Sequence, residues 1–238
     1  MQRTLLTAAA LLLAVLVLTP ARAADDQAPN TLSEQERKDG WKLLFDGKSL
    51  DGWRVFKKQD TTGWTVKDDA IFLEKSGGDL MTKEKYGNFE FVIDWKFASG
   101  DNSGIIYRIT EDVSPSYMSG PEMQVMPQKA ADKLGKNSGG SLYDMYAPTA
   151  NPFKPADQWN TFKIVCNGKH IEQWVNGVKV VETDVGSDDW NTRLAASKWK
   201  NAKLFASQPT GHIALQDHGA KVAFRNVKIK VLPDSEKK

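Results

Sequence analysis

Two Asn-Gly pairs close together constrain the fold of this chain more than any other feature. The segment TFKIVCNGKHIEQWVNGVKVVET holds them at Asn167-Gly168 and Asn176-Gly177, between runs in which apolar and polar residues alternate. Asn-Gly between such runs is the strongest short-range signal for a β-hairpin, because both residues tolerate the positive φ that a tight turn needs. The segment therefore predicts three consecutive antiparallel strands.

The same alternation continues through the rest of the chain. It is clearest in FEFVIDWKF and SGIIYRI, and it recurs in GHIALQDHG and VAFRNVKIKV near the C-terminus. Together with shorter segments between residues 41 and 84, these make about twelve short strands with turn signals about every 8–12 residues. Two long loops interrupt them, at 127–140 and 187–208, and NTRLAASKWK in the second is a helix candidate. The pattern predicts an all-β sandwich or barrel.

The first 23 residues have the features of a secretory signal peptide. Positive charge at the start is followed by the apolar run 5–18 and by ARA, which ends at Ala23. The run is shorter than the ~20 residues of a membrane-spanning helix, and no cysteine follows it to carry a lipid. We therefore expect cleavage after Ala23, a periplasmic or secreted protein, and no membrane span in the mature chain.

The remainder divides into three parts. Residues 24–40 form an N-terminal segment with a short helix over 31–38, in which Thr31 is the expected N-cap and Glu34 has the capping-box spacing. Residues 41–233 are expected to form one domain, because they contain no internal repeat and no linker. Residues 234–238 are a tail.

Charge and cysteine content narrow the possible partners. Lys and Arg total 32 against 30 for Asp and Glu, with no basic block, so a nucleic-acid partner is not expected. The one cysteine, Cys166, excludes an intramolecular disulfide. It shares its alternation with Phe162 and Ile164, which predicts a buried thiol rather than a nucleophile. The three histidines lack zinc-ligand spacing, so no metal site is assigned. A hard cation such as calcium, or another cofactor, stays open.

Alternation also selects a set of polar side chains. If the aromatic positions of FEFVIDWKF are core, the intervening polar residues face outward, and the same reasoning applies to the strands that follow. We expect a converging polar patch, with Tyr143, Asp144 and Tyr146 at its rim. Its members are Asp94, Lys96, Arg108, Glu122, Gln124, Gln216 and His218. The alternative is a solvated sheet face of paired charges.

Several segments, in order, resemble the 3-keto-disaccharide hydrolase domain family. The resemblance implies a concanavalin A- or laminarinase-like jelly roll, meaning two curved antiparallel sheets. It also implies an exported bacterial protein that acts on an oxidised glycoside or disaccharide. The segments are GWKLLFDGKSLDGWRVF, GDLMTKEKYGNFEFVIDWKFASGDNSGIIYR, GPEMQV, GSLYDMYAP, WNTFKIVCNGKHIEQWVNG and GHIALQDHGAKVAFRNVKIK.

The strand PEMQVMP fits the chemistry of such a substrate better than ordinary glycoside hydrolysis. Jelly-roll glucanases carry E-x-D-x-x-E on one strand, and here Glu122 is followed by Gln124 and Pro127 in place of the other two acids. A 3-keto sugar needs only one base for the acidic C2 proton, together with groups that stabilise the enolate. Asp94 or Asp144 could still supply a second carboxylate.

These considerations lead to a provisional assignment of roles. The catalytic candidates are Glu122, Asp94 and His218. The substrate-binding candidates are Lys96, Arg108, Gln124, Tyr143 and Gln216. Trp190 and Trp199 could stack on a sugar ring or pack within their loop. Three hypotheses stand: cleavage of 3-keto-glycosides by elimination at C1 and addition of water, a non-catalytic carbohydrate-binding module, and a conventional β-glucanase.

Overall fold

The computed structural model describes residues 28–234, so the expected signal peptide lies outside the described residues. Eight strands form one sheet, in the order β11-β10-β9-β6-β13-β4-β3 with β1 also pairing with β13. Their bounds are β1 (Trp41–Leu43), β3 (Trp64–Lys67), β4 (Ala70–Leu73), β6 (Phe89–Ser99), β9 (Asn160–Asn167), β10 (His170–Val175), β11 (Val178–Asp184) and β13 (Lys221–Val231).

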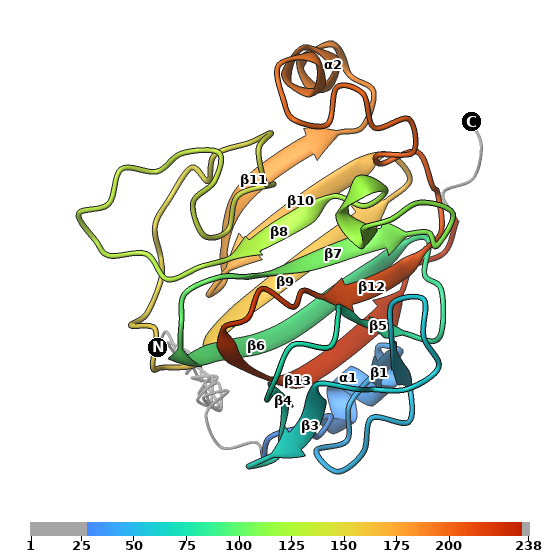
Figure 1. Cartoon of the computed structure of the whole chain (residues 1–238), viewed down its shortest axis with the longest axis vertical. Coiled ribbons are helices and arrows are strands. Elements are labelled where there is room, and N and C mark those ends of the chain that lie inside the picture. The colour runs from blue at the N-terminus through green and yellow to red at the C-terminus, as the bar shows by residue number, and fades with distance from the viewer. Residues whose placement is uncertain (1–27, 235–238) are drawn as a thin grey trace, which may run out of the picture.

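Five further strands form the second sheet, in the order β2-β5-β12-β7-β8. They are β2 (Trp53–Val55), β5 (Leu80–Thr82), β7 (Ser103–Ile109), β8 (Glu122–Val125) and β12 (His212–Leu215). The strand pairs in both sheets are antiparallel. The two sheets lie face to face (Figure 1). The β-sandwich predicted from the alternation is confirmed, and so is the jelly roll of two antiparallel sheets that the family resemblance implies.

Apolar side chains from the facing surfaces of both sheets make up the core. On β6 the aromatic and aliphatic positions Phe89, Phe91 and Trp95 are fully buried, as their alternation predicts. From the other sheet, Met123 and Val125 of β8 join the same cluster. Side chains at the intervening positions of each sheet consequently point away from the core, in opposite directions for the two sheets.

The hairpin prediction is confirmed. Strands β9, β10 and β11 follow one another as antiparallel neighbours, and positive φ occurs at Gly168 (60°), Asn176 (47°) and Gly177 (82°). Cys166 lies on β9 with 0% exposure. Burial raises the pKa of its thiol to about 12, which agrees with the prediction of an unreactive thiol.

The two α-helices differ in detail from their predictions. Helix α1 (Glu34–Lys38) lies within the expected range, but Ser33 is its N-cap and Glu36 completes the capping box, not Thr31 and Glu34. Helix α2 (Asp188–Ala195) starts three residues earlier than NTRLAASKWK, because Ser187 accepts a hydrogen bond from the backbone N–H of Trp190 and caps it there. No described helix has the length and apolar character needed to cross a membrane.

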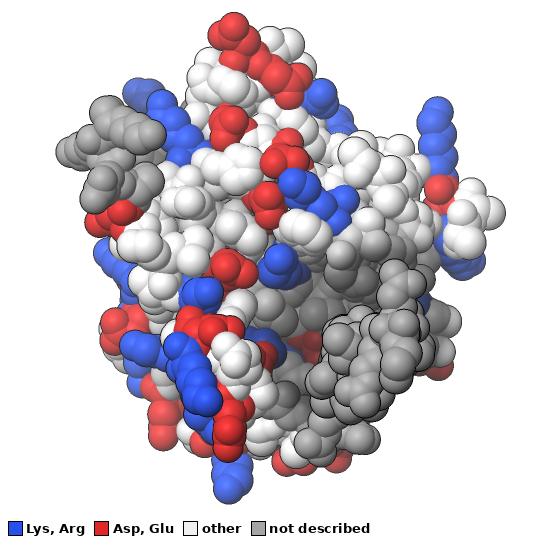
Figure 2. Space-filling model, turned by 180° about the vertical axis from the view of Figure 1, so that it is seen from behind, with Lys and Arg blue, Asp and Glu red and all other residues white. Residues whose placement is uncertain are grey.

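Seen from behind, the molecule has acidic and basic side chains interspersed over its surface (Figure 2). The outer face of the eight-stranded sheet contributes many of them. On β10 and β11, Lys179 Nζ lies 3.1 Å from Glu172 and 2.6 Å from Glu182. On this face, the alternative interpretation from the sequence holds: it is a solvated sheet surface with paired charges.

Candidate functional site

Glu122 and Gln124 lie on the outer face of the five-stranded sheet. Strand β8 runs antiparallel to β7 (Figure 1), with Glu122 opposite Ile106 and Gln124 opposite Gly104. Both side chains are nearly buried, Glu122 at 4% and Gln124 at 1% exposure. The alternation of PEMQV is therefore confirmed: Met123 points into the core, while the carboxyl and amide groups share the other face.

Gly104 on β7 makes room for the Glu122 carboxyl group. A Cβ atom built on this glycine would lie 2.4 Å from Glu122 Oε1 and 2.8 Å from its Cδ. Real Cβ atoms do not approach other heavy atoms so closely, so any other residue at 104 would displace the carboxyl group. The glycine is thus part of what positions the acid.

The surroundings of Glu122 raise its pKa to about 7. Burial is the main cause, and the nearby Asp79 adds to it, whereas the charge of Lys198 and a hydrogen bond with the Gln216 amide oppose it. A carboxyl group with a pKa near neutrality exchanges protons readily at physiological pH. This is the property expected of a general acid or base.

Three of the predicted binding residues gather around Glu122. The Gln124 amide donates to Asn102 Oδ1 at 2.9 Å. Gln216 interacts with the carboxyl group itself. The backbone N–H of Tyr143 donates to the carbonyl oxygen of Glu122 at 2.9 Å. Burial, followed by the charge of Glu122, raises the pKa of the Tyr143 phenol, so both ends of this tyrosine are close to the acid.

Asp79 is a second acidic group that sequence reasoning missed. It stands just before β5, where its Oδ1 accepts the backbone N–H of Asp217 at 2.9 Å and its Oδ2 accepts the Ser116 hydroxyl. Burial raises its pKa, against the effect of these hydrogen bonds and of His218. It lines a cleft of about 280 Å³ together with Gln216 and His218. The sequence gives only a weak signal for Asp79. This residue precedes a short strand, so no alternation of apolar and polar residues indicates which way its side chain points.

Lys198 is the second residue missed. It follows α2 in the loop before β12, and much of its side chain is exposed. Its ammonium nitrogen lies 4.0 Å from the ring centre of Tyr143 and 4.3 Å from that of Trp199. Loss of water around the ammonium group lowers its pKa, while the charges of Glu122 and Asp144 raise it. No periodicity predicts which loop side chain reaches a site.

The structure places Asp94 and Lys96 away from Glu122, contrary to the predicted convergence. Both do point away from the core, but β6 belongs to the eight-stranded sheet, whose outer face is on the other side of the sandwich. Asp94 accepts hydrogen bonds from Thr161 and Asn226, each at 2.6 Å. Lys96 lies 4.8 Å from the ring centre of Trp159.

The alternation also predicts the wrong direction for the Arg108 side chain. Strand β7 has an extra residue against β12, because Ile106 and Ile109 pair with Ala214 and His212 across a register shift. Arg108 sits in this bulge with a φ of 54°. Its guanidinium donates to the carbonyl oxygens of Gly87 (2.9 and 3.1 Å) and Gly168 (2.8 Å), which ties loops together instead of facing the Glu122 site.

The predicted rim residues and the two loop tryptophans make contacts that stabilise the fold. Asp144 pairs with Lys136 at 2.7 Å and accepts the backbone N–H of Lys198 at 2.7 Å. The Tyr146 hydroxyl accepts a hydrogen bond from Thr183 Oγ1. Trp190 and Trp199 are each only 2% exposed, so packing within the loop accounts for both indole rings.

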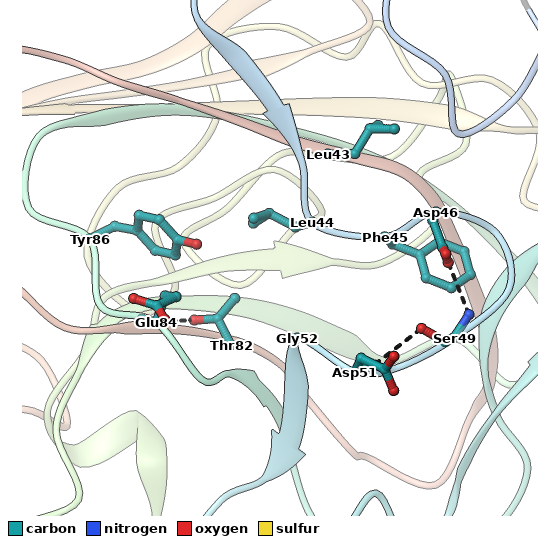
Figure 3. Close-up of a pocket in the computed structure, with 10 residues that line it drawn as sticks. All are labelled: Leu43, Leu44, Phe45, Asp46, Ser49, Asp51, Gly52, Thr82, Glu84 and Tyr86. Atoms are coloured by element: carbon teal, nitrogen blue, oxygen red, sulfur yellow. Dashed lines mark hydrogen bonds between the residues drawn. The ribbon is translucent and has the colours of Figure 1, made fainter.

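A hollow beside β5 is a first alternative to the Glu122 site. It has a volume of about 260 Å³ and lies where the loop after β1 meets β5 (Figure 3). Asp46 there accepts the N–H groups of Lys48 (2.8 Å) and Ser49 (2.9 Å), and Thr82 Oγ1 donates to the Glu84 carbonyl oxygen. These polar groups hold the loop in place, so the Glu122 site remains the better candidate.

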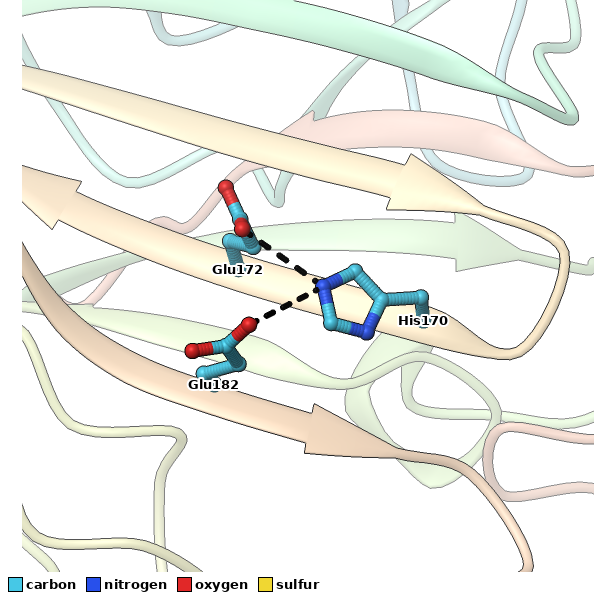
Figure 4. Close-up of side chains that lie close together, drawn as sticks. All are labelled: His170, Glu172 and Glu182. Atoms are coloured by element: carbon cyan, nitrogen blue, oxygen red, sulfur yellow. Dashed lines mark ion pairs between the residues drawn. The ribbon is translucent and has the colours of Figure 1, made fainter.

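The second feature is a group of potential metal ligands on β10 and β11. His170, Glu172 and Glu182 have ligand atoms within 4.8 Å of one another (Figure 4). The ammonium of Lys179 already pairs with both glutamates, and His170 Nδ1 pairs with Asp184 at 2.9 Å. The group is therefore a cross-strand network of ion pairs.

The fold is a jelly-roll sandwich, and its candidate site is built around a buried carboxyl group on one outer face. The comparisons with known proteins identify the family. The chain belongs to the family described as the 3-keto-alpha-glucoside-1,2-lyase-like domain, whose model matches residues 40–230.

Relatives support this membership. A 3-keto-disaccharide hydrolase from Bacteroides thetaiotaomicron is 34% identical over 229 residues, which cover 82% of this chain and 79% of the relative. A crystal structure of a proposed glycosyl hydrolase from Parabacteroides distasonis has a TM-score of 0.80 and 34% identity, and covers 87% of this chain and 100% of its own. A second structure from that organism has a TM-score of 0.64 and 27% identity, covering 81% and 99%. The family is thus one of 3-keto-disaccharide hydrolase-like proteins.

Proposed function

We propose that this chain is an exported enzyme that cleaves 3-keto-glycosides, with Glu122 as the base that removes the proton from C2. The observation that carries the proposal is the single buried carboxyl group of pKa about 7, surrounded by amide, phenol and ammonium groups. The leader-like residues 1–23 support export, which N-terminal sequencing of the mature protein tests.

The first chemical step is an elimination. The Glu122 carboxylate takes the proton from C2, and the electron pair of that C–H bond forms the enolate with the negative charge on the C3 oxygen. When the ketone re-forms, the electrons make a C1–C2 double bond and the C1–O bond breaks. The departing oxygen takes up a proton from solvent water, and an unsaturated 3-keto sugar remains.

The second step adds water to this product. The water oxygen bonds to C1 and releases one proton to the solvent. Glu122, whose proton exchanges with the solvent after the elimination, supplies the proton that C2 takes up. The sum of the two steps is hydrolysis, although the bond is broken by elimination. These two steps are compatible both with the lyase-like description of the family and with the hydrolase name of the Bacteroides relative.

A conventional retaining or inverting glycosidase is the second candidate, and Asp79 is the observation that favours it. The charge of Asp79 contributes to the raised pKa of Glu122, so the two carboxyl groups interact electrostatically. A conventional glycosidase needs such a pair of carboxyl groups. Against it, Asp79 is held by the Ser116 hydroxyl and the backbone N–H of Asp217. These hydrogen bonds suit a fixed structural acid better than a nucleophile.

Cleavage in heavy water separates the candidates. The purified chain would be incubated in D₂O with a glycoside and with its 3-keto derivative, and the released sugar analysed for deuterium at C2. We expect cleavage of the keto form with deuterium at C2. Cleavage of the parent glycoside without C2 label would support a conventional glycosidase, and binding without turnover of either would support a binding module.

Substitution of the base completes the test. Glu122→Gln keeps the shape of the side chain and removes proton transfer, so turnover should fall by about 10²–10⁴-fold. Glu182→Gln is the matched control, because Glu182 is an exposed glutamate of the other sheet and should retain wild-type turnover. Near-wild-type turnover of Glu122→Gln would refute Glu122 as the base.

A further inference from the structure

The elimination needs a positive group for the enolate oxygen, and the two cations predicted from the sequence do not provide it. Arg108 donates to the carbonyl oxygens of Gly87 and Gly168. Lys96 lies on the outer face of the opposite sheet, over Trp159. Among the cations of the described residues, Lys198 has the surroundings that suit this role beside Glu122.

The backbone of Lys198 is firmly held at the edge of the site. Its N–H donates to Asp144 Oδ2 at 2.7 Å. The next residue, Trp199, donates from its indole nitrogen to the Tyr143 carbonyl oxygen at 3.2 Å and stacks on Phe205, with ring centres 4.9 Å apart and planes 10° apart. The loop therefore presents Lys198 from a fixed point, and its side chain is exposed.

Three aromatic rings surround the Lys198 ammonium group. Its nitrogen lies 4.0, 4.3 and 5.6 Å from the ring centres of Tyr143, Trp199 and Tyr117. Such rings attract a cation through their negative faces without neutralising its charge. The ammonium group therefore keeps hydrogen-bond donors available for a ligand, since an aromatic face does not use up all three of them.

Glu122 and Lys198 influence each other without pairing. The lysine charge lowers the pKa of Glu122, and the glutamate charge raises that of Lys198. Yet neither residue joins any ion pair within the part of the chain that the structure describes. Tyr143 links the two residues in space, because its backbone N–H donates to the Glu122 carbonyl oxygen at 2.9 Å and its ring centre lies 4.0 Å from the Lys198 nitrogen.

We propose that Lys198 is a catalytic residue whose ammonium group donates hydrogen bonds to the C3 oxygen of the 3-keto sugar as this oxygen becomes an enolate. The inference rests on the proposed function. The ammonium group neither gains nor loses its proton in this step, because it acts by charge and hydrogen bonding on the oxygen while Glu122 receives the proton from C2. Tyr143 and Trp199 hold the cation in position beforehand.

Two substitutions at Lys198 test this role. Lys198→Met keeps the length of the chain and removes the charge, so kcat should fall about 10²–10³-fold with little change in KM, as when an oxyanion-stabilising donor is lost. Lys198→Arg restores a cation and should recover part of the rate. Lys200→Met is the control, since Lys200 is an exposed lysine of the same loop, and its turnover should equal that of the wild type.

A second measurement does not depend on turnover. With carbon-13 at the glutamate carboxyl carbons, NMR titration follows Glu122, whose pKa should rise above about 7 in Lys198→Met and stay unchanged in Lys200→Met. If the wild type is active but Lys198→Met has unchanged turnover and an unchanged Glu122 titration, the role of Lys198 is wrong while the proposed function stands. A wild type inactive on every 3-keto-glycoside would overturn the proposed function and this role with it.

Discussion

At the scale of single residues, Glu122 shows how a strand can change the chemistry of a carboxyl group. Its neighbours on β8 bury it at 4% exposure, and Gly104 provides the space that its carboxyl group fills. The same side chain on a solvated face would remain ionised at neutral pH. Burial is thus the main cause of its raised pKa, and burial should also have a measurable cost.

This cost predicts a pH-dependent effect of Glu122→Gln on stability. The pKa of Glu122 is about 7 in the folded protein against 4.5 for the free group, so its contribution to folding is complete below pH 4.5 and is lost as the pH rises through 7. Above pH 7 the buried carboxylate costs on the order of 3 kcal/mol. Glu122→Gln should therefore stabilise the protein more at about pH 8 than at about pH 5.

Urea unfolding at the two pH values measures the difference. Glu74→Gln serves as the control, because Glu74 is an exposed glutamate just after β4 and should show a small effect at both pH values. If Glu122→Gln changed the free energy of unfolding equally at both, the pKa of Glu122 would be ordinary and its proposed role as a base would lose its main support.

At the scale of elements, the pair β7 and β8 builds the site. Antiparallel pairing places Gln124 opposite Gly104 and Glu122 opposite Ile106, so the acid reaches across to the glycine's open position. The two faces of β8 were predicted correctly from the sequence, because the alternation of polar and apolar residues is visible within its four residues. The alternation did not predict the bulge at Arg108, since an extra residue in one strand shows only against its partner β12.

Gly104→Ala tests this arrangement of the two strands. The new Cβ would lie 2.4 Å from Glu122 Oε1, so the carboxyl group must move by about 1 Å, and such a misplacement costs about 10²-fold in rate. Stability should fall by about 1–3 kcal/mol from overpacking. Gly135→Ala, where a Cβ meets nothing within 4 Å, should retain turnover. Wild-type kinetics for Gly104→Ala would show that the position of the carboxyl group does not matter.

At the scale of the whole molecule, the sandwich has two outer faces, and sequence alternation cannot tell them apart. Asp94 and Glu122 both occupy positions that point away from the core, as expected. Their strands, β6 and β8, belong to different sheets, so the two carboxyl groups point to opposite sides. Sheet membership depends on long-range pairing, which is why the alternation predicted Gln124 and Gln216 beside Glu122 but wrongly added Asp94 and Lys96.

Asp94→Asn provides the corresponding test. Asp94 bridges three strands of the eight-stranded sheet through Thr161 and Asn226, and replacing the carboxylate should cost about 1–3 kcal/mol of unfolding free energy. Turnover of a 3-keto-glycoside should remain at the wild-type level. A large loss of turnover in a folded Asp94→Asn protein would instead return Asp94 to the list of candidate bases.

Cys166 on β9 makes the chain a convenient subject for labelling. It is the one thiol in the sequence, and neighbouring strands on both sides cover it completely. An alkylating reagent can reach it only when those strands separate, so slow modification of the native protein counts the openings of the sheet. A cysteine introduced in the loop that carries Lys198 would be the only fast-reacting thiol, and a fluorophore placed there would report whether a sugar binds beside the loop.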